Sequence, residues 1–355
     1  MTTTDFTHNA AGLRVLVLGV NFPGALMHSY EMAFRRLGAD VETYCLSRAY
    51  ANGLSATAVR IANRVAPTLL MRRFNAKLLA DLSGRRIDIA LVLKGERIAP
   101  RTIDALRAAT GARWLNFYPD DPFSDLRWNR LAYGTETLGA YDHCFTFAQH
   151  LIPRYQSAGA RRVSWLPFAR DPDLHAPVPN VREPEYEIVF VGNIDGERVR
   201  WLESVAGSFK MGIFGEHTRA AVPGGSALRR AAFLPAAYGT ELAAALARGA
   251  ISLNVMRDQN RFSHNMRSFE SLACGAFTLS QRTPELEAMF RENMEVAFAD
   301  APADLPARVE YWLPRAAERR RVAAAGFGRV RDDTYEERAR TILATVALAA
   351  VAPER

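Results

Sequence analysis

Residues 13–20 read LRVLVLGV, a nearly continuous run of apolar side chains. Such a run predicts a parallel β-strand buried on both faces, because helices cover both sides of a parallel sheet. The chain then turns at NFPG and continues as LMHSYEMAFRRLG, whose apolar residues recur at helical spacing and which ends in a glycine. A strand followed by an amphipathic helix is the repeating unit of a doubly wound α/β fold.

This alternation of strands and helices recurs along most of the chain. Further strands are predicted at DVETYCL, DIALVLKG, RWLNFYPDDP, YDHCFTFA and RVSWLP, with helical patterns between them. The stretch LPFARDPDLHAPVPNVREPEYE has many prolines and no period, which is typical of a linker. The alternation then restarts with EIVFVGN, KMGIFG, AISLNV and AFTLS, and the chain ends in amphipathic helical segments.

A chain of 355 residues is long enough for two domains. We predict an N-terminal domain over residues 1–169, a linker over 170–185 and a C-terminal domain over 186–333. The final helix, 334–355, is expected to return to the N-terminal domain, because its apolar end needs a surface to cover. The predicted fold class is α/β, with two Rossmann-like domains facing each other across a cleft.

The composition, 49% hydrophobic and 23% charged, is typical of a globular protein. The formal net charge of +7 permits anionic partners without choosing among them. We predict no nucleic-acid partner, and no sequence feature supports contact with a membrane surface. The three cysteines have no paired spacing, so neither a disulfide frame nor a zinc site is expected, and a cytoplasmic location fits. We find neither a signal peptide nor an apolar run of membrane-spanning length.

The standard motifs of several enzyme classes are absent from the sequence. No Gly-x-Gly-x-x-Gly follows a predicted strand, and no Walker-type phosphate loop is present, which argues against common dinucleotide and nucleoside-triphosphate sites. Neither a His-Glu-x-x-His metal motif nor a Gly-x-Ser-x-Gly nucleophile elbow occurs. We therefore expect no resident cofactor and no metal ion.

The stretch SHNMRSFESLACGAFTLS, residues 263–280, ends like a helix that enters a buried strand, yet it begins with many polar side chains. A helix beginning near Asn265 would offer its free N–H groups to a phosphate. Arg267 in the first turn can add a contact to that phosphate. Glu270, one turn later, can accept hydrogen bonds from two neighbouring hydroxyls. Together they match the ribose and diphosphate of a nucleotide-sugar.

The segment MRSFESLACGAFTLSQRTPELEAMF resembles the donor-binding segment of GT-B glycosyltransferases of the family 4 type. The combination Arg-x-x-Glu-x-x-Ala-Cys-Gly, with ERRRVAAAG and TYEERA in the tail, is similar to the CgeB-like (spore maturation protein B-type) branch. VLKGERIAPRTIDALR and FYPDDP resemble the domain usually fused to it. The resemblance covers most of the chain. It implies a metal-independent transferase that takes a sugar from a nucleotide-diphosphate donor and retains its configuration.

Within this resemblance, Glu270 matches the second glutamate of the family's Glu-x7-Glu pattern, which holds the ribose. The position of the first glutamate is Phe262, so the group that meets the donor sugar is not identified. Gly192 and Asn193 match the turn after the first strand of the C-terminal domain. The residues predicted to bind the donor are Gly192, Asn193, Asn254, Arg257, Ser263, His264, Asn265, Arg267 and Glu270.

The N-terminal domain is expected to bind the acceptor, whose chemical class stays open. Asp120 and Asp121 follow a predicted strand and can orient an acceptor hydroxyl or act as a base. His28 falls near the start of the first helix, at the same edge of the sheet. These three residues are the predicted catalytic set. The alternatives are that the two aspartates cap a turn and that His28 is structural.

Several donor-site residues also have structural interpretations. Glu270 and Arg267 can form a surface ion pair, His264 can be a polar loop residue, and Gly192 can serve only a tight turn. Two other functions compete with glycosyl transfer: a nucleotide-sugar epimerase with the same fold, and a non-catalytic nucleotide-sugar-binding protein. Reaction of the donor without an acceptor would distinguish the epimerase, and slow donor hydrolysis would argue against a binding protein.

Overall fold

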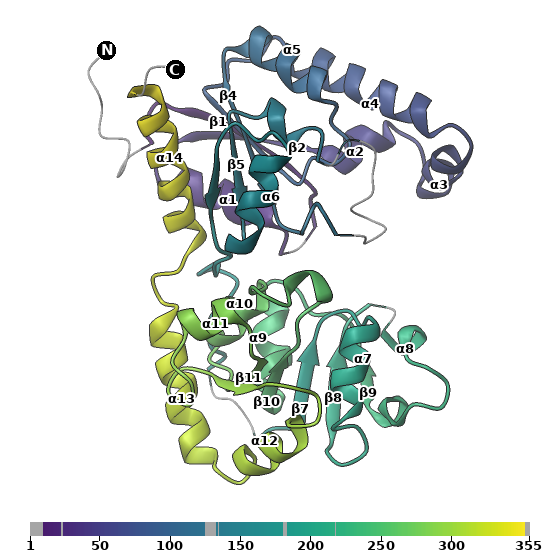
Figure 1. Ribbon diagram of the computed structural model, residues 1–355, viewed down its shortest axis with the longest axis vertical. Helices are drawn as coiled ribbons and strands as arrows, with labels where there is room; N and C mark the ends of the chain where they lie inside the picture. Colours follow the sequence, from purple (N-terminus) through teal and green to yellow (C-terminus); the bar gives the residue numbers. More distant parts are fainter. Residues whose placement is uncertain are drawn as a thin grey trace. The chain divides into compact units, whose positions relative to one another are not determined.

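The computed structural model describes residues 10–22, 24–124, 133, 135–179, 183–216 and 218–351 (Figure 1). The chain forms two compact units. The N-terminal unit comprises Met1–Pro167 together with Tyr335–Arg355, and the C-terminal unit comprises Phe168–Thr334. Each unit contains a parallel six-stranded sheet.

The sheet of the N-terminal unit has the strand order β2-β1-β3-β4-β5-β6. The apolar run of residues 13–20 forms the inner strand β1, in which Leu16, Val17 and Leu18 are at most 1% exposed. Helices lie on both faces of this sheet, which explains why its inner strands are apolar throughout. The strands are β1 (Arg14–Gly19), β2 (Asp40–Cys45), β3 (Ile89–Leu93), β4 (Arg113–Tyr118), β5 (His143–Thr146) and β6 (Val163–Trp165).

Residues 56–82 form two successive helices, separated at Ala66. Pro67 at the start of the second helix disfavours the helical conformation for Ala66, which has φ −145° and ψ 51°. Proline is tolerated there because the first N–H of a helix has no partner within the helix. The helices of this unit are α1 (Leu26–Arg36), α2 (Leu46–Ala51), α3 (Ala56–Val65), α4 (Pro67–Leu82), α5 (Pro100–Thr110), α6 (Ile152–Ser157) and α14 (Tyr335–Val351).

Helix α14 packs against α1, although some 300 residues separate them in the chain (Figure 1). The rings of Tyr30 and Tyr335 meet edge to face, with centroids 5.3 Å apart. Arg338 Nε donates a hydrogen bond to the carbonyl oxygen of Pro167 at 3.1 Å. The predicted return of the final helix to the N-terminal unit is confirmed.

The C-terminal unit has the strand order β12-β11-β10-β7-β8-β9. The first strand, β7, lies between β10 and β8, which is the order of the doubly wound dinucleotide-binding fold. The connection after β7 therefore runs toward β8, whereas the connection after the neighbouring β10 runs toward β11, in the opposite direction along the sheet. The strands are β7 (Tyr186–Val191), β8 (Met211–Phe214), β9 (Ala232–Leu234), β10 (Gly249–Asn254), β11 (Thr278–Gln281) and β12 (Ala297–Ala299).

The helices of the C-terminal unit close its core. Trp312, at the end of α12, is 2% exposed, and its ring centroid lies 4.8 Å from that of Phe277, the residue before β11. The helices are α7 (Gly196–Glu203), α8 (Thr218–Ala221), α9 (Thr240–Ala247), α10 (Arg267–Ala273), α11 (Pro284–Met289), α12 (Leu305–Trp312) and α13 (Ala316–Arg329). No helix in the described residues is long and apolar enough to cross a bilayer.

Part of the segment predicted as a linker is packed within the C-terminal unit. Asp171 is 3% exposed and His175 is 4% exposed. Arg170 forms an isolated parallel bridge with Thr334, and its backbone N–H donates to the carbonyl oxygen of Asp333 at 2.9 Å. The two chain segments that connect the units therefore run side by side where they enter and leave the C-terminal unit.

Candidate functional site in the C-terminal unit

The carboxyl ends of β7 and β10 carry most of the residues predicted to bind a donor. Gly192 and Asn193 follow β7, and Asn254 ends β10, with Arg257 three residues later. Adjacent strands whose connections run to opposite sides leave a crevice at this point, where doubly wound sheets bind their ligands. The topology thus brings together residues that are about 60 positions apart in the chain.

Arg198, which sequence reasoning missed, joins the loops that follow these two strands. Its Nη1 donates to the carbonyl oxygen of Asn193 at 2.8 Å, and its Nε donates to that of Val255 at 3.1 Å. Asp195 begins helix α7 and accepts a hydrogen bond from the backbone N–H of Arg198 at 3.0 Å. This N-cap fixes the first turn of the helix and so holds Arg198 between the loops that follow β7 and β10.

Three arginines share this edge of the sheet. Burial, together with the positive charges of Arg257 and Arg267, lowers the pKa of Arg198 to about 10. Asp195 opposes this effect, and its Oδ2 lies 3.5 Å from Nε of Arg257. A buried guanidinium that is repelled by two others is stabilised by any anion that enters, so the site favours a negatively charged ligand.

Glu270 and Arg267 form an ion pair, with Oε2 of Glu270 2.8 Å from Nη1 of Arg267. Glu270 is 5% exposed, and Nε of Arg267 is buried without a hydrogen-bond partner among the described residues. On the other side, Oε1 of Glu270 faces Nε2 of His175 at 3.7 Å. The Arg267–Glu270 pairing that we considered as an alternative is thus present, although the pair is largely buried rather than on the surface.

His175 is a second residue that sequence reasoning missed, because it lies in the proline-rich segment. Its Nδ1 accepts a hydrogen bond from the backbone N–H of Asp171 at 3.0 Å, so the proton of the neutral ring is on Nε2, which faces Glu270. Burial lowers the pKa of His175, although the Glu270 carboxylate raises it in part. His175 therefore faces Glu270 mainly as a neutral ring, at a distance longer than a hydrogen bond.

Asn254 and Asn265 fix the start of helix α10. Asn254 Nδ2 donates to the hydroxyls of Ser268 at 3.1 Å and Ser280 at 3.2 Å, while its Oδ1 accepts from Asn265 Nδ2 at 2.9 Å. Asn265 Oδ1 in turn accepts from the backbone N–H of Ser268 at 3.0 Å. The helix begins at Arg267, two residues after the predicted start, and these amides hold β10, β11 and α10 together.

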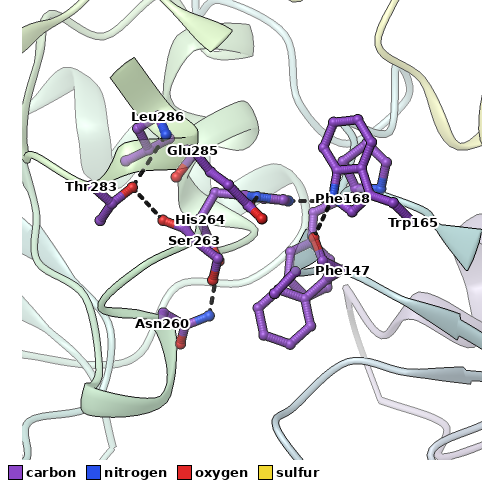
Figure 2. Close-up of polar contacts among 12 residues, drawn as sticks. Phe147, Trp165, Phe168, Asn260, Ser263, His264, Thr283, Glu285 and Leu286 are labelled. Carbon is purple, nitrogen blue, oxygen red and sulfur yellow. Dashed lines mark hydrogen bonds and ion pairs between the residues drawn. The ribbon is translucent and has the colours of Figure 1, made fainter. Parts of the chain in front are cut away.

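Ser263 and His264 lie in a buried polar cluster (Figure 2). His264 Nδ1 contacts Oε2 of Glu285 at 2.9 Å, and its Nε2 accepts from the backbone N–H of Phe168 at 3.1 Å. The carbonyl oxygen of Ser263 accepts from the hydroxyl of Thr283. Both residues are 0% exposed, so these contacts connect the loop before α10 to the start of α11 and to the beginning of the unit.

The loop after β7 contacts Glu216, and the Glu216 carboxylate in turn interacts with Tyr238. Asn193 Oδ1 accepts from the backbone N–H of Glu216 at 2.9 Å. Burial and the carboxylate of Glu216 raise the pKa of Tyr238, whereas Arg267 lowers it. Tyr238 is 37% exposed, so a partly exposed aromatic side chain lies within the electrostatic reach of Arg267.

In the N-terminal unit, Asp120 and Asp121 lie after β4. Asp120 Oδ2 is 2.9 Å from Nζ of Lys94, which follows β3 and has the left-handed φ of 69°. Asp121 is 7% exposed, and burial raises the pKa of its carboxyl group. Its Oδ1 accepts from the backbone N–H of Phe123 at 2.8 Å. Asp121 therefore caps a turn in the structure, and Lys94 has a backbone conformation that is uncommon for residues other than glycine.

His28 lies in the first turn of α1, with a half-exposed side chain whose Nδ1 is 4.0 Å from Oε2 of Glu31. It shares the carboxyl edge of this sheet with Asp120 and Asp121. No group of three or more His, Cys, Asp or Glu side chains suited to a metal ion occurs in the described parts of the chain.

Comparison with known proteins places these features in a family context. Residues 183–344, a little under half of the chain, match a family model described as "Glycosyl transferase-like". Most of the matched residues lie in the C-terminal unit, which is thus similar in sequence to that family. The search of curated proteins finds no match. The narrower resemblance to the CgeB-like branch stays a prediction.

Solved structures show the same fold over nearly the whole chain. Sucrose-phosphate synthase from Thermosynechococcus elongatus is 13% identical with a TM-score of 0.69, over 95% of this chain and 100% of that one. Trehalose 6-phosphate synthase from Burkholderia multivorans is 15% identical with a TM-score of 0.64, over 97% and 99%. Anabaena Alr3699/HepE, solved with UDP-glucose, is 10% identical with a TM-score of 0.63, over 96% and 100%. The fold is GT-B, as predicted.

Proposed function

We propose that this protein transfers a sugar from a nucleotide-diphosphate-sugar donor to an acceptor. The observation that carries the proposal is the group of Arg198, Arg257 and Arg267 at the carboxyl ends of β7 and β10. Three guanidiniums accompanied by Asp195 and Glu270 leave a net positive charge, which suits a diphosphate. The glycosyltransferase-like family match and the neighbour solved with UDP-glucose support the same ligand class.

In this proposal the donor lies with its diphosphate against the arginines. The bond between the sugar's anomeric carbon and the diphosphate oxygen breaks, and a bond from that carbon to the acceptor oxygen forms. Negative charge grows on the departing diphosphate, so Arg257 and Arg267 stabilise the transition state more than the bound donor. The arginines take the role that a metal ion has in other transferases, so the reaction needs neither a metal nor a cofactor.

Glu270 would accept hydrogen bonds from the ribose hydroxyls, with its orientation fixed by Arg267. Tyr238 would contact the base. The acceptor would bind to the N-terminal unit, where Asp120, Asp121 and His28 are candidates to take or orient the proton of its hydroxyl. The proton otherwise passes to the departing diphosphate, which fits retention of configuration.

The test is turnover and binding with UDP-glucose and a panel of other UDP-, GDP- and ADP-sugars. We expect one donor to bind and to be hydrolysed slowly without an acceptor. Arg257→Ala should lower that turnover by about a hundredfold, whereas Arg200→Ala, which removes an exposed arginine from α7, should leave it unchanged. Conversion of the lone donor to its epimer would establish the epimerase instead. Binding without any turnover would establish a non-catalytic binding protein, and no binding by the whole panel would refute the proposal.

A further inference from the structure

Helix α3 contains no buried residue, unlike the helices around it. Four large apolar side chains on α3 and its flanks are exposed: Leu54 by 43%, Ile61 by 57%, Val65 by 72% and Leu69 by 50%. The helix stands at the end of α4, away from the sheet of its unit (Figure 1). Because packing on this unit buries none of its side chains, the core does not explain the apolar residues of α3.

The same segment is strongly basic. Residues 46–80 contain no aspartate or glutamate, and their six cationic side chains supply most of the chain's net charge of +7. No ion pair is described for Arg60, Arg64, Arg72 or Arg73 in the part of the chain covered by the structure, and all four are exposed. The six cations are Arg48, Arg60, Arg64, Arg72, Arg73 and Lys77.

Apolar and cationic side chains alternate on one surface. Ile61 and Val65 are one helical turn apart on α3, as are Arg60 and Arg64 on the adjoining strip. On α4, Leu69 is followed within one turn by Arg72 and Arg73, all exposed, whereas Leu70, Met71 and Phe74 turn inward. We call this surface the α3–α4 face and define it by Leu54, Arg60, Ile61, Arg64, Val65, Leu69, Arg72 and Arg73.

We propose that the α3–α4 face binds the surface of an anionic lipid bilayer. An amphipathic helix with arginines beside aliphatic side chains lies in the interface, with the aliphatic groups among the acyl chains and the arginines at the headgroups. A nucleic acid would engage the arginines but leaves Ile61, Val65 and Leu69 without apolar contacts. A second copy of the face would bring like charges together. An anionic bilayer satisfies both kinds of side chain at once.

The test is sedimentation of the full chain with vesicles of phosphatidylcholine alone and of phosphatidylcholine with phosphatidylglycerol. We expect binding only to the anionic vesicles. Each arginine near such a surface contributes a factor of about five in partitioning, so Arg60→Glu with Arg64→Glu should weaken binding at least roughly 25-fold. Ile61→Glu with Val65→Glu should also weaken binding by about tenfold or more, because each substitution loses the burial of an aliphatic side chain. The matched controls are Met294→Glu, an exposed apolar residue, and Arg320→Glu with Arg321→Glu, exposed arginines of α13.

A second readout is insertion of the face into the bilayer. The tryptophan emission of Val65→Trp, compared with that of the unsubstituted chain, should shift to shorter wavelength with anionic vesicles. Equal binding to neutral and anionic vesicles would overturn the proposal, as would an equal loss in the α13 control. Binding to heparin or oligonucleotides that ignores Ile61→Glu would assign the face to a polyanion. A dimer abolished by Ile61→Glu would assign it to self-association. Either result would overturn the lipid assignment.

Discussion

Replacing Glu270 with glutamine separates a ligand contact from a structural ion pair, because the two side chains have nearly the same shape. In the structure the carboxylate accepts a hydrogen bond from Arg267 at 2.8 Å and faces His175 at 3.7 Å. A hydrogen bond to a charged group contributes about 1.5–3 kcal/mol. If Glu270 also holds the ribose hydroxyls, the dissociation constant of UDP should rise by about 10- to 150-fold in Glu270→Gln.

Thermal unfolding in the presence of UDP provides the assay, with GDP and ADP in parallel. UDP at 100 times its dissociation constant adds about 2.7 kcal/mol to the stability of the unsubstituted protein. At the same UDP concentration, Glu270→Gln should gain only about 1.4 to 0.3 kcal/mol, because the ratio of ligand to dissociation constant falls. One kcal/mol corresponds to roughly 2–4 °C for a unit of this size. Glu241→Gln, an exposed carboxylate on α9, is the control.

The 2′,3′-dideoxy analogue of UDP decides between the two roles. It lacks the hydroxyls, so Glu270→Gln should bind it almost as well as the unsubstituted protein does. An equal loss for UDP and for its dideoxy analogue would refute the ribose contact. Unchanged UDP binding with lower stability would mean that Glu270 and Arg267 serve the fold alone.

Three further predictions concern different parts of the molecule. Donor turnover should persist in a chelator and should not rise with added magnesium or manganese; loss in the chelator with recovery on metal addition would contradict the role given to the arginines. Gly326→Ala should destabilise the C-terminal unit by about 1–3 kcal/mol, because its new Cβ would lie 2.5 Å from the carbonyl oxygen of Glu295. The control Gly328→Ala should stabilise the unit slightly, because a Cβ there would have no atom within 4 Å. Equal effects of the two substitutions on urea unfolding would refute the packing argument. Burial lowers the pKa of His143 to about 4, so the unfolded chain binds a proton at His143 at higher pH than the folded chain does. The free energy of unfolding should therefore fall by about 3 kcal/mol as pH falls from 6.5 to 4. His143→Gln should flatten that part of the urea-unfolding profile, and an unchanged slope would show that other groups govern it.

The fold was predictable because its signals are local. Each buried strand is a short apolar run, such as the one that became β1, and Gly38 and Pro67 mark helix ends that follow from backbone sterics. The proline-rich segment was predicted as a linker because composition, too, is a local signal. Its composition excludes helix and strand periodicity, but it does not determine burial, and His175 is packed within the C-terminal unit.

The candidate site was only partly predictable. Arg267 and Glu270 are one helical turn apart, so their proximity follows from spacing alone. Arg198 was missed because its role depends on the adjacency of β7 and β10, which no local pattern reveals. His264 resembles a ligand contact in sequence, yet its ring contacts Glu285 and Phe168, which are distant in the chain. The exposure of Ile61 and Val65 could not be predicted from the sequence either, because an amphipathic pattern does not determine which face of the helix packs against the protein.

Because α14 belongs to the N-terminal unit, the ribosome begins this unit first but completes it last. The N-terminal unit needs residues 335–351 to cover α1, yet the whole of Phe168–Thr334 is made before them. At about 5–20 residues per second, the ribosome leaves Tyr30 without this cover for roughly 10–30 s after Pro167 has been added. The later unit, continuous in the chain, can therefore finish folding first, and the nascent N-terminal unit presents an apolar surface to chaperones during that interval.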